Sequence, residues 1–143
     1  SSHDLSAMRE LLGMPKRVIS ARQWDRFIIA FFEYENFTLS FETGIDHNRR
    51  FDAQIQVYGE TKEILLQYDT PYIRHLPTQL IIKETQGEAF EARTIRPTFT
   101  DAYTLELLHF HQVVTQNVPP RTTAEDFLQD LDLFEMLINS LRQ

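Results

Sequence analysis

The chain has 143 residues, of which 42% are hydrophobic and 24% charged, so it is typical of a globular protein with room for one domain and a hydrophobic core. Its net charge of −7 argues against nucleic-acid binding, which requires a basic patch. Cysteine is absent, which excludes thiolate metal sites and fits a cytoplasmic location. The longest apolar run, residues 27–32, is far shorter than the roughly 20 residues of a membrane helix.

The first predicted elements are a short helix and a series of strands. Residues 4–12 place leucine and methionine on one side of a helix, which the Gly13-Met-Pro15 stretch ends. Apolar and polar residues then alternate in residues 37–42 and 51–57, which is typical of an antiparallel sheet with one buried and one polar face. The predicted strands are residues 18–24, 27–33, 37–42, 51–57, 64–68, 79–85 and 89–95.

Two longer loops interrupt the strands, at residues 43–50 and 69–77. Proline at both ends of the second loop keeps it out of a strand ladder. This loop contains Tyr72, Arg74 and His75, whose polar groups could hydrogen-bond a polyol or a carboxylate in a substrate. An ordinary loop surface is the other interpretation of the same residues.

After Pro97 the pattern changes to that of helices. We predict one helix over residues 101–116 and a second that begins at a capping box of Thr122 and Glu125 and ends near Leu141. Its acidic residues are assigned to a solvated face: Glu125, Asp126, Asp130 and Asp132. Its core-facing stripe is predicted to comprise Ala124, Phe127, Leu128, Leu131, Phe134, Ile138 and Leu141. The element order predicts an α+β domain, a mostly antiparallel open β-sheet with helices packed on one face.

His3 is the sharpest candidate for a functional group. It stands at the start of the first helix, next to Asp4, where the helix dipole favours a carboxylate. A helix cap and an unrelated exposed histidine are the alternative interpretation. His109 and His111 are two residues apart on a predicted helix and cannot bind one ion, so a hydrogen-bonded core histidine is the simpler assignment. No dinucleotide, phosphate-loop, hydrolase or zinc motif occurs, and we predict no metal site in this chain.

Three stretches, in this order and spacing, carry a likeness to a known family. The first is His3-Asp-Leu5 with a short helix that ends in Leu12-Gly-Met-Pro15. The second is the strand over residues 51–58, the turn at Gly59 and the strand that follows. The third is the pair of predicted helices that follow the strands, which Pro119-Pro120 separate and of which the second begins with acidic residues. Together they resemble the C-terminal domain of the Gfo/Idh/MocA family of NAD(P)-dependent oxidoreductases.

This resemblance implies a dihydrodipicolinate-reductase-like fold and the substrate-binding and oligomerisation half of an enzyme that acts on a sugar, a polyol or a related hydroxy compound. NAD or NADP would be bound in the full-length parent by a Rossmann half, with no cofactor bound by this chain alone. His3 would position the substrate hydroxyl or transfer a proton, together with partners that the resemblance places before Ser1. The isolated chain is expected to be inactive.

The resemblance also implies a homodimer or a higher oligomer through the open sheet face. The alternating strands give this face the polar residues Thr38, Ser40, Glu42, Asp52, Gln54 and Gln56, and exposure to solvent is the alternative. Two other functions stay open beside the oxidoreductase. One is a regulatory module of the same architecture, like the galactose-type repressors. The other is a free-standing domain that binds a small ligand.

Overall fold

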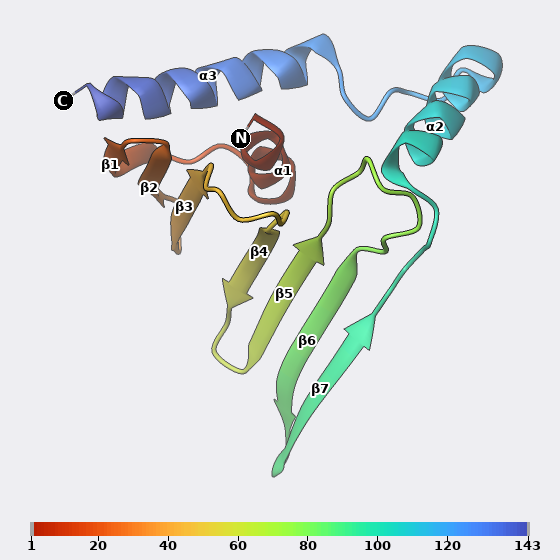
Figure 1. Ribbon diagram of the computed structural model, residues 1–143, viewed down its shortest axis with the longest axis horizontal. Coiled ribbons are helices and arrows are strands. Elements are labelled where there is room, and N and C mark those ends of the chain that lie inside the picture. The colour runs from red at the N-terminus through yellow and green to blue at the C-terminus, as the bar shows by residue number, and fades with distance from the viewer. Residues whose placement is uncertain (1, 143) are drawn as a thin grey trace. The chain divides into compact units, whose positions relative to one another are not determined.

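The computed structural model describes residues 2–142, which form two compact units (Figure 1). One unit joins residues 2–48 to residues 121–142, and the second is Arg49–Pro120. All strand pairs are antiparallel, which confirms the predicted α+β class. The strands form two sheets rather than one continuous sheet, because residues 45–52 make a loop with a turn at Asp46 and Asn48 instead of a hairpin.

The first unit consists of a three-stranded sheet and two helices. Its elements are α1 (Ser2–Leu12), β1 (Arg17–Trp24), β2 (Phe27–Glu33), β3 (Thr38–Gly44) and α3 (Ala124–Leu141). Helix α1 ends because Gly13 takes the left-handed conformation at φ 77°, which glycine adopts without steric cost, and its N–H donates to the carbonyl of Arg9. Helix α3 packs on β1 and on α1. The buried core side chains are Leu5, Met8, Ala30, Phe32, Tyr34, Phe41, Leu133 and Leu137.

The alternation predicted for residues 37–42 is confirmed for Leu39 and Phe41 of β3, which face the core while Ser40 between them is exposed. It is wrong for Phe37, which precedes the strand, stacks on Tyr34 and is 46% exposed. Register explains why β2 is apolar on both faces. Ala30 and Phe32 are fully buried, while Ile29 and Phe31 lie on the outer face of the sheet, beside polar residues of β1 and β3. The nearly continuous apolar run of this strand therefore serves two different surfaces.

The buried face of α3 differs from the predicted stripe. Leu133 and Leu137 are buried, whereas Phe127, Leu128 and Leu131 are 59%, 60% and 48% exposed. Phe134 and Leu141 do pack against the core, so part of the prediction holds. The helix carries apolar residues on more than one side, and contact with β1 and α1, which periodicity cannot detect, decides which side is buried.

Two further predictions about α3 were wrong. Asp130 is 8% exposed and not on a solvated face. The capping box is formed by Thr123 and Asp126, one residue later than predicted: the Asp126 N–H donates to the Thr123 hydroxyl at 3.2 Å, and the Thr123 N–H donates to the Asp126 carboxylate at 2.8 Å. Asp130 is buried because Arg9 and Ser6 of α1 bind its carboxylate.

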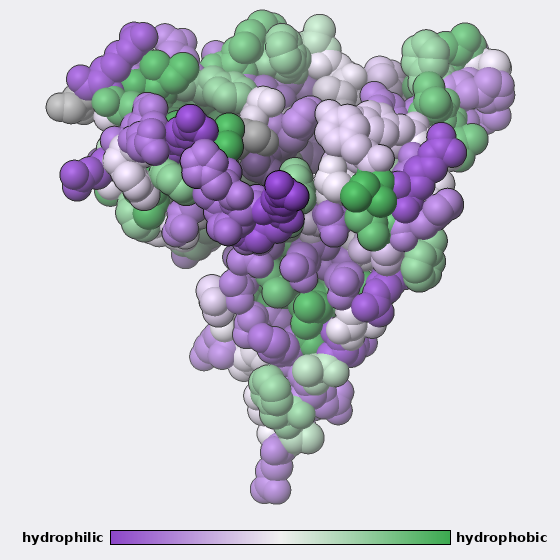
Figure 2. Space-filling model, in the orientation of Figure 1, coloured by the Kyte–Doolittle hydropathy of each residue, from purple (hydrophilic) through white to green (hydrophobic). Residues whose placement is uncertain are grey.

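The second unit is a four-stranded sheet followed by a helix. Its elements are β4 (Ala53–Tyr58), β5 (Lys62–Tyr68), β6 (Gln79–Gln86), β7 (Ala89–Ile95) and α2 (Ala102–Gln116), with sheet order β4-β5-β6-β7. None of the residues 49–120 is buried. Apolar side chains of α2 lie at its surface, among them Leu107 and Phe110 (Figure 2). Within residues 2–142 no helix is both long and apolar enough to cross a membrane.

Candidate functional site

His3 lies in the first turn of α1 and its side chain is exposed. The helix is held in place by Leu5 and Met8, which are 2% and 5% exposed and pack into the core of the first unit. Because side chains three and four residues apart share a helix face, Ser6 and Ala7 lie on the same side of α1 as His3. This face is the part of the helix that the core does not cover.

The exposed side of α1 forms one wall of an open hollow of about 430 Å³, which we call the α1 hollow. The other wall is the segment Arg121 and Thr122, directly before the capping box of α3. The lining residues are His3, Ser6, Ala7, Arg9, Glu10, Arg121 and Thr122, all of which belong to the first unit. Imidazole, hydroxyl, guanidinium and carboxylate groups therefore surround one space, which suits a polar, hydroxyl-bearing ligand.

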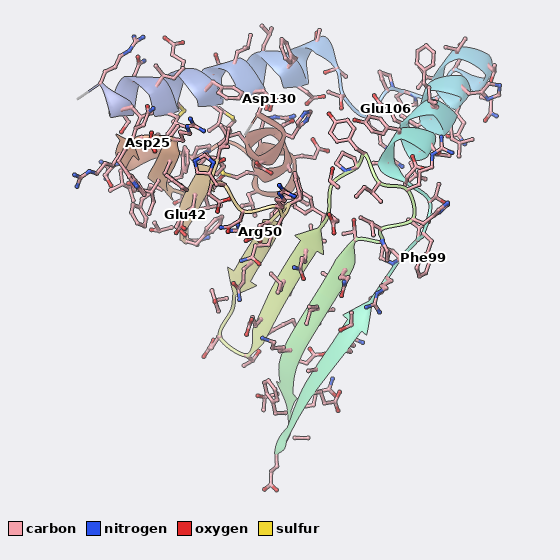
Figure 3. The ribbon with its side chains drawn as sticks, viewed as in Figure 1. Asp25, Glu42, Arg50, Phe99, Glu106 and Asp130 are labelled. Carbon is pink, nitrogen blue, oxygen red and sulfur yellow. The ribbon has the colours of Figure 1, made fainter. Side chains whose placement is uncertain are left out.

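A buried ion pair lies behind this hollow and joins α1 to α3. Arg9 is 6% exposed, and its Nε donates to Oδ1 of Asp130 at 2.5 Å. Figure 3 labels Asp130 on the side of α3 that lies over α1. Ser6 Oγ donates to the other oxygen of the same carboxylate, Oδ2, at 2.9 Å. A third contact runs from Nη1 of Arg9 to Oδ1 of Asp126 at 3.5 Å. Both oxygens of Asp130 are thus bound by side chains of α1.

The charges of this network stabilise each other. The hydrogen bond from Arg9 to Asp130 raises the pKa of the Arg9 guanidinium, against the opposing effect of burial. The pKa of Asp126 is lowered, first by the backbone N–H of Thr123, then by the Thr123 hydroxyl, and also by the positive charge of Arg9. The guanidinium and the Asp126 carboxylate are therefore charged at neutral pH.

The pairing of Arg9 with Asp130 was not predicted from the sequence. The available signal was the position of Arg9 one residue after Met8 and four after Leu5, on the apolar side of an otherwise amphipathic helix. Asp130 likewise lies three residues before the buried Leu133, and so on the same face of its helix. A charged residue on the apolar face of a helix indicates a buried partner, because an unpaired buried charge is costly.

The second candidate group, Tyr72, Arg74 and His75, lies in the second unit, on the loop before β6. Tyr72 is 83% exposed, and its ring centroid lies 6.0 Å from that of Tyr103 on α2. The hydrogen bond with Tyr72 raises the pKa of the Tyr103 hydroxyl. Nδ1 of His75 lies 3.3 Å from the carbonyl oxygen of Phe99. These contacts tie the loop to the segment around the start of α2.

The pKa of Asp101, the N-cap residue at the start of α2, is lowered mainly by hydrogen bonds from Thr104 and to a smaller extent by the positive charge of Arg74. His75 has a backbone φ of 64°, in the left-handed region that costs a residue with a Cβ atom free energy. The contacts of the loop therefore hold a strained backbone.

The other histidines show no metal geometry. Within residues 2–142, no group of three or more His, Asp or Glu side chains could hold a metal ion. The expectation of a hydrogen-bonded His109 was wrong, since its Nε2 is buried without a hydrogen-bond partner. The histidine is also not a core residue, because residues 49–120, which include α2, contain no buried residue.

The polar residues predicted for one sheet face are divided between the two sheets. Ser40 and Glu42 are exposed on the outer face of β3, whereas Gln54 and Gln56 are exposed on β4, and Asp52 lies just before that strand. β3 belongs to the sheet of the first unit and β4 to the sheet of the second. A contact surface must therefore be sought on one sheet at a time.

No family model and no curated protein matches the chain. Solved structures do match. They include the candidate oxidoreductases yvaA from Bacillus subtilis (14% identity, TM-score 0.68) and YPO2259 from Yersinia pestis (12%, 0.75). A third is KijD10, a 3-ketoreductase from Actinomadura kijaniata in complex with TDP-benzene and NADP (17%, 0.68). Each alignment covers 99% of this chain but only 48%, 46% and 44% of the respective neighbour. The chain therefore has the α+β fold of the matched half of these structures, as the resemblance to the C-terminal domain of the Gfo/Idh/MocA family predicts.

Proposed function

We propose that this chain is the substrate-binding half of an NAD(P)-dependent oxidoreductase that acts on a sugar, a polyol or a related hydroxy compound. The observation that carries the proposal is the extent of the structural match: nearly the whole chain aligns, each time with about half of a longer structure. One of these longer structures contains NADP and a nucleotide-linked ligand. The identities are too low to transfer an activity by themselves, so the chemistry must come from the residues of this chain.

The residues of this chain do not fit a dinucleotide. Its four glycines stand singly at positions 13, 44, 59 and 87, and a dinucleotide pyrophosphate requires a glycine-rich turn at a helix start. The nicotinamide, which supplies hydride-transfer chemistry, would be bound by a different part of the full-length protein. We therefore derive no step of the reaction through it and assign to this chain the binding and proton-transfer roles.

In this proposal the α1 hollow binds the substrate. His3 lines it and can accept a proton from a substrate hydroxyl or donate one to a carbonyl oxygen, since the two ring nitrogens of imidazole serve as acceptor and donor. Arg121, Thr122 and Glu10 provide donors and acceptors for the remaining hydroxyl groups. Tyr72, Arg74 and His75 form a second substrate-binding proposal, which rests on the polar groups that their exposed loop presents. We place the activity in the cytoplasm, in line with the cysteine-free composition.

The test uses the full-length product of the gene that encodes this chain. We expect dinucleotide-dependent oxidation or reduction of a sugar or polyol, followed as nicotinamide absorbance, and a loss of about 10²–10⁴-fold in kcat for His3→Ala, the usual contribution of a general acid or base. His47→Ala is the matched control, since His47 lies in an exposed loop of the same unit. Full activity of His3→Ala would refute the role of His3. Tight sugar binding without dinucleotide-dependent turnover would favour the ligand-binding or regulatory alternative.

We also propose that two copies of the chain associate through the outer face of the first sheet. In the register of this sheet, Ile29 lies between Arg22 on β1 and Glu42 on β3, so a basic and an acidic residue flank one apolar residue. Phe31, 39% exposed, continues the apolar centre. A two-fold axis parallel to β2 brings Arg22 of each copy opposite Glu42 of the other, which makes the face self-complementary.

Charge reversal tests this association. Glu42→Arg should dissociate the dimer in sedimentation equilibrium, because like charges then oppose each other, and the double variant Arg22→Glu/Glu42→Arg should restore it. Gln56→Arg, on the other sheet, is the control and should leave the mass unchanged. A wild-type chain that sediments as a monomer at all concentrations would contradict the proposal.

A further inference from the structure

The α1 hollow has two walls from distant parts of the sequence, and Arg9 is connected to both. Its own helix carries His3, Ser6 and Glu10 on the first wall. The second wall, Arg121 and Thr122, leads directly into Thr123, the N-cap residue of α3. A ligand in the hollow would contact both walls, so their separation and orientation determine which groups it can reach.

The first connection fixes the rotation of α1. Oδ1 of Asp130 accepts a hydrogen bond from Nε of Arg9 at 2.5 Å, and Oδ2 accepts one from the Ser6 hydroxyl at 2.9 Å. Two attachment points three residues apart prevent the helix from turning about its axis or sliding along it. Leu5 and Met8 alone would not do this, because an apolar contact has no preferred direction.

The second connection reaches the opposite wall. Nη1 of Arg9 lies 3.5 Å from Oδ1 of Asp126, and the other carboxylate oxygen of Asp126 accepts the Thr123 N–H at 2.8 Å and the Thr123 hydroxyl at 3.0 Å. Thr123 in turn caps α3 through the Asp126 N–H. The planar guanidinium can bind two carboxylates at once through different nitrogens, which a lysine ammonium cannot do in the same geometry.

We infer that Arg9 is a positioning residue that sets the geometry of the α1 hollow by holding α1, which carries His3, against the Arg121–Thr122 segment. This inference deepens the proposed function, because it assigns to Arg9 the placement of the proposed proton-transfer group. Arg9 also lines the hollow, but only 6% of it is exposed, and the effect inferred here is exerted through its bonds to Asp130 and Asp126. The same geometry requires Asp130 as its second member.

The decisive measurement is the environment of His3 under fully native conditions. NMR spectra at one fixed pH report the ring resonances of His3 and the methyl resonance of Thr122 in Arg9→Met and Arg9→Lys variants of this chain. We expect both resonances to shift or broaden in Arg9→Met and to shift less in Arg9→Lys. Arg17→Met is the matched control, since it removes an exposed ion pair, Arg17 with Glu33 at 2.6 Å, in the same unit, and it should leave both resonances unchanged.

A purely stabilising ion pair would change the unfolding midpoint but not the native resonances of His3, so unchanged spectra in Arg9→Met would overturn the inference. Where Arg9→Met does not fold, Arg9→Lys and Asp130→Asn provide the same comparison. In the full-length protein, Arg9→Lys should lower kcat about 10- to 100-fold with a smaller change in KM, as expected when a reacting group is misplaced. Absence of turnover in the wild-type protein would refute the proposed function alone, because the His3 resonances still decide the role of Arg9.

Discussion

Two leucines of α3 provide a direct test of which face of this helix is buried. Leu133 is fully buried, with 0% exposure, while Leu131 is 48% exposed, although the apolar periodicity of the sequence favours Leu131 as a core residue. Replacement of a fully buried leucine by alanine removes apolar contacts and leaves a cavity, which destabilises a protein by about 2–5 kcal/mol. The same replacement at the exposed position should change stability by only about 0.5 kcal/mol, as is usual for surface sites.

Urea unfolding can measure this difference in the first unit alone, because Trp24, the single tryptophan of the chain, lies in β1, on which α3 packs. With a denaturant slope of about 1–2 kcal/mol per molar urea, Leu133→Ala should lower the midpoint by roughly 1–5 M. Leu131→Ala should move it by less than about 0.5 M. Equal losses in the two variants, or a larger loss in Leu131→Ala, would refute the assignment of the buried face.

Three further predictions concern the same unit. Thr123→Ala should lower the free energy of unfolding by about 1 kcal/mol through loss of the α3 cap, and Thr123→Ser should retain most of it, which urea unfolding can measure. The pKa of Asp126 is lowered in the folded state, so ionisation of this carboxyl stabilises the fold at a pH above its unfolded pKa. This stabilisation is lost as the pH falls through the lowered pKa. The urea midpoint of Asp126→Asn should therefore depend less on acid pH than the midpoint of the wild type. Gly44→Ala places a Cβ atom against Cδ1 of Phe27, inside van der Waals contact, which should cost about 1–3 kcal/mol. Because that ring stacks on Trp24 at 5.8 Å, the tryptophan emission should change, and an unchanged emission spectrum would contradict this contact.

The fold was largely predictable because its elements have clear local signals. Alternation in residues 37–42, the glycine at position 13 and the threonine-acid pair before α3 each indicate a structure that depends on neighbours in sequence. The division of the strands into two sheets was not predictable, since it depends on which strands pair across the loop at residues 45–52. No local pattern distinguishes a sheet that continues through such a loop from one that ends there.

Of the candidate site, His3 was predictable from the sequence, but the ion pairs of Arg9 with Asp130 and Asp126 were not. His3 was singled out by residue type and by position at a helix start, and it lines the α1 hollow. Arg121 and Thr122 are more than a hundred positions away in the sequence, so only the packing of α3 against α1 brings them to the same space. The periodicity of α3 favoured its exposed face, and for this reason Asp130 was assigned to solvent.

The ion pair between Arg9 and Asp130 is not explained by stability alone. A buried ion pair loses hydration when it forms, and replacement of such a pair by apolar side chains of similar volume is often neutral or stabilising. An apolar pair of side chains would not fix the rotation of α1 about its own axis. Successive residues of an α-helix are turned by about 100°, so a side chain of α1 that is fixed toward α3 also fixes the direction of every other side chain on that helix. With Arg9 and Ser6 both bound to Asp130, the direction of His3 is determined by the same contacts.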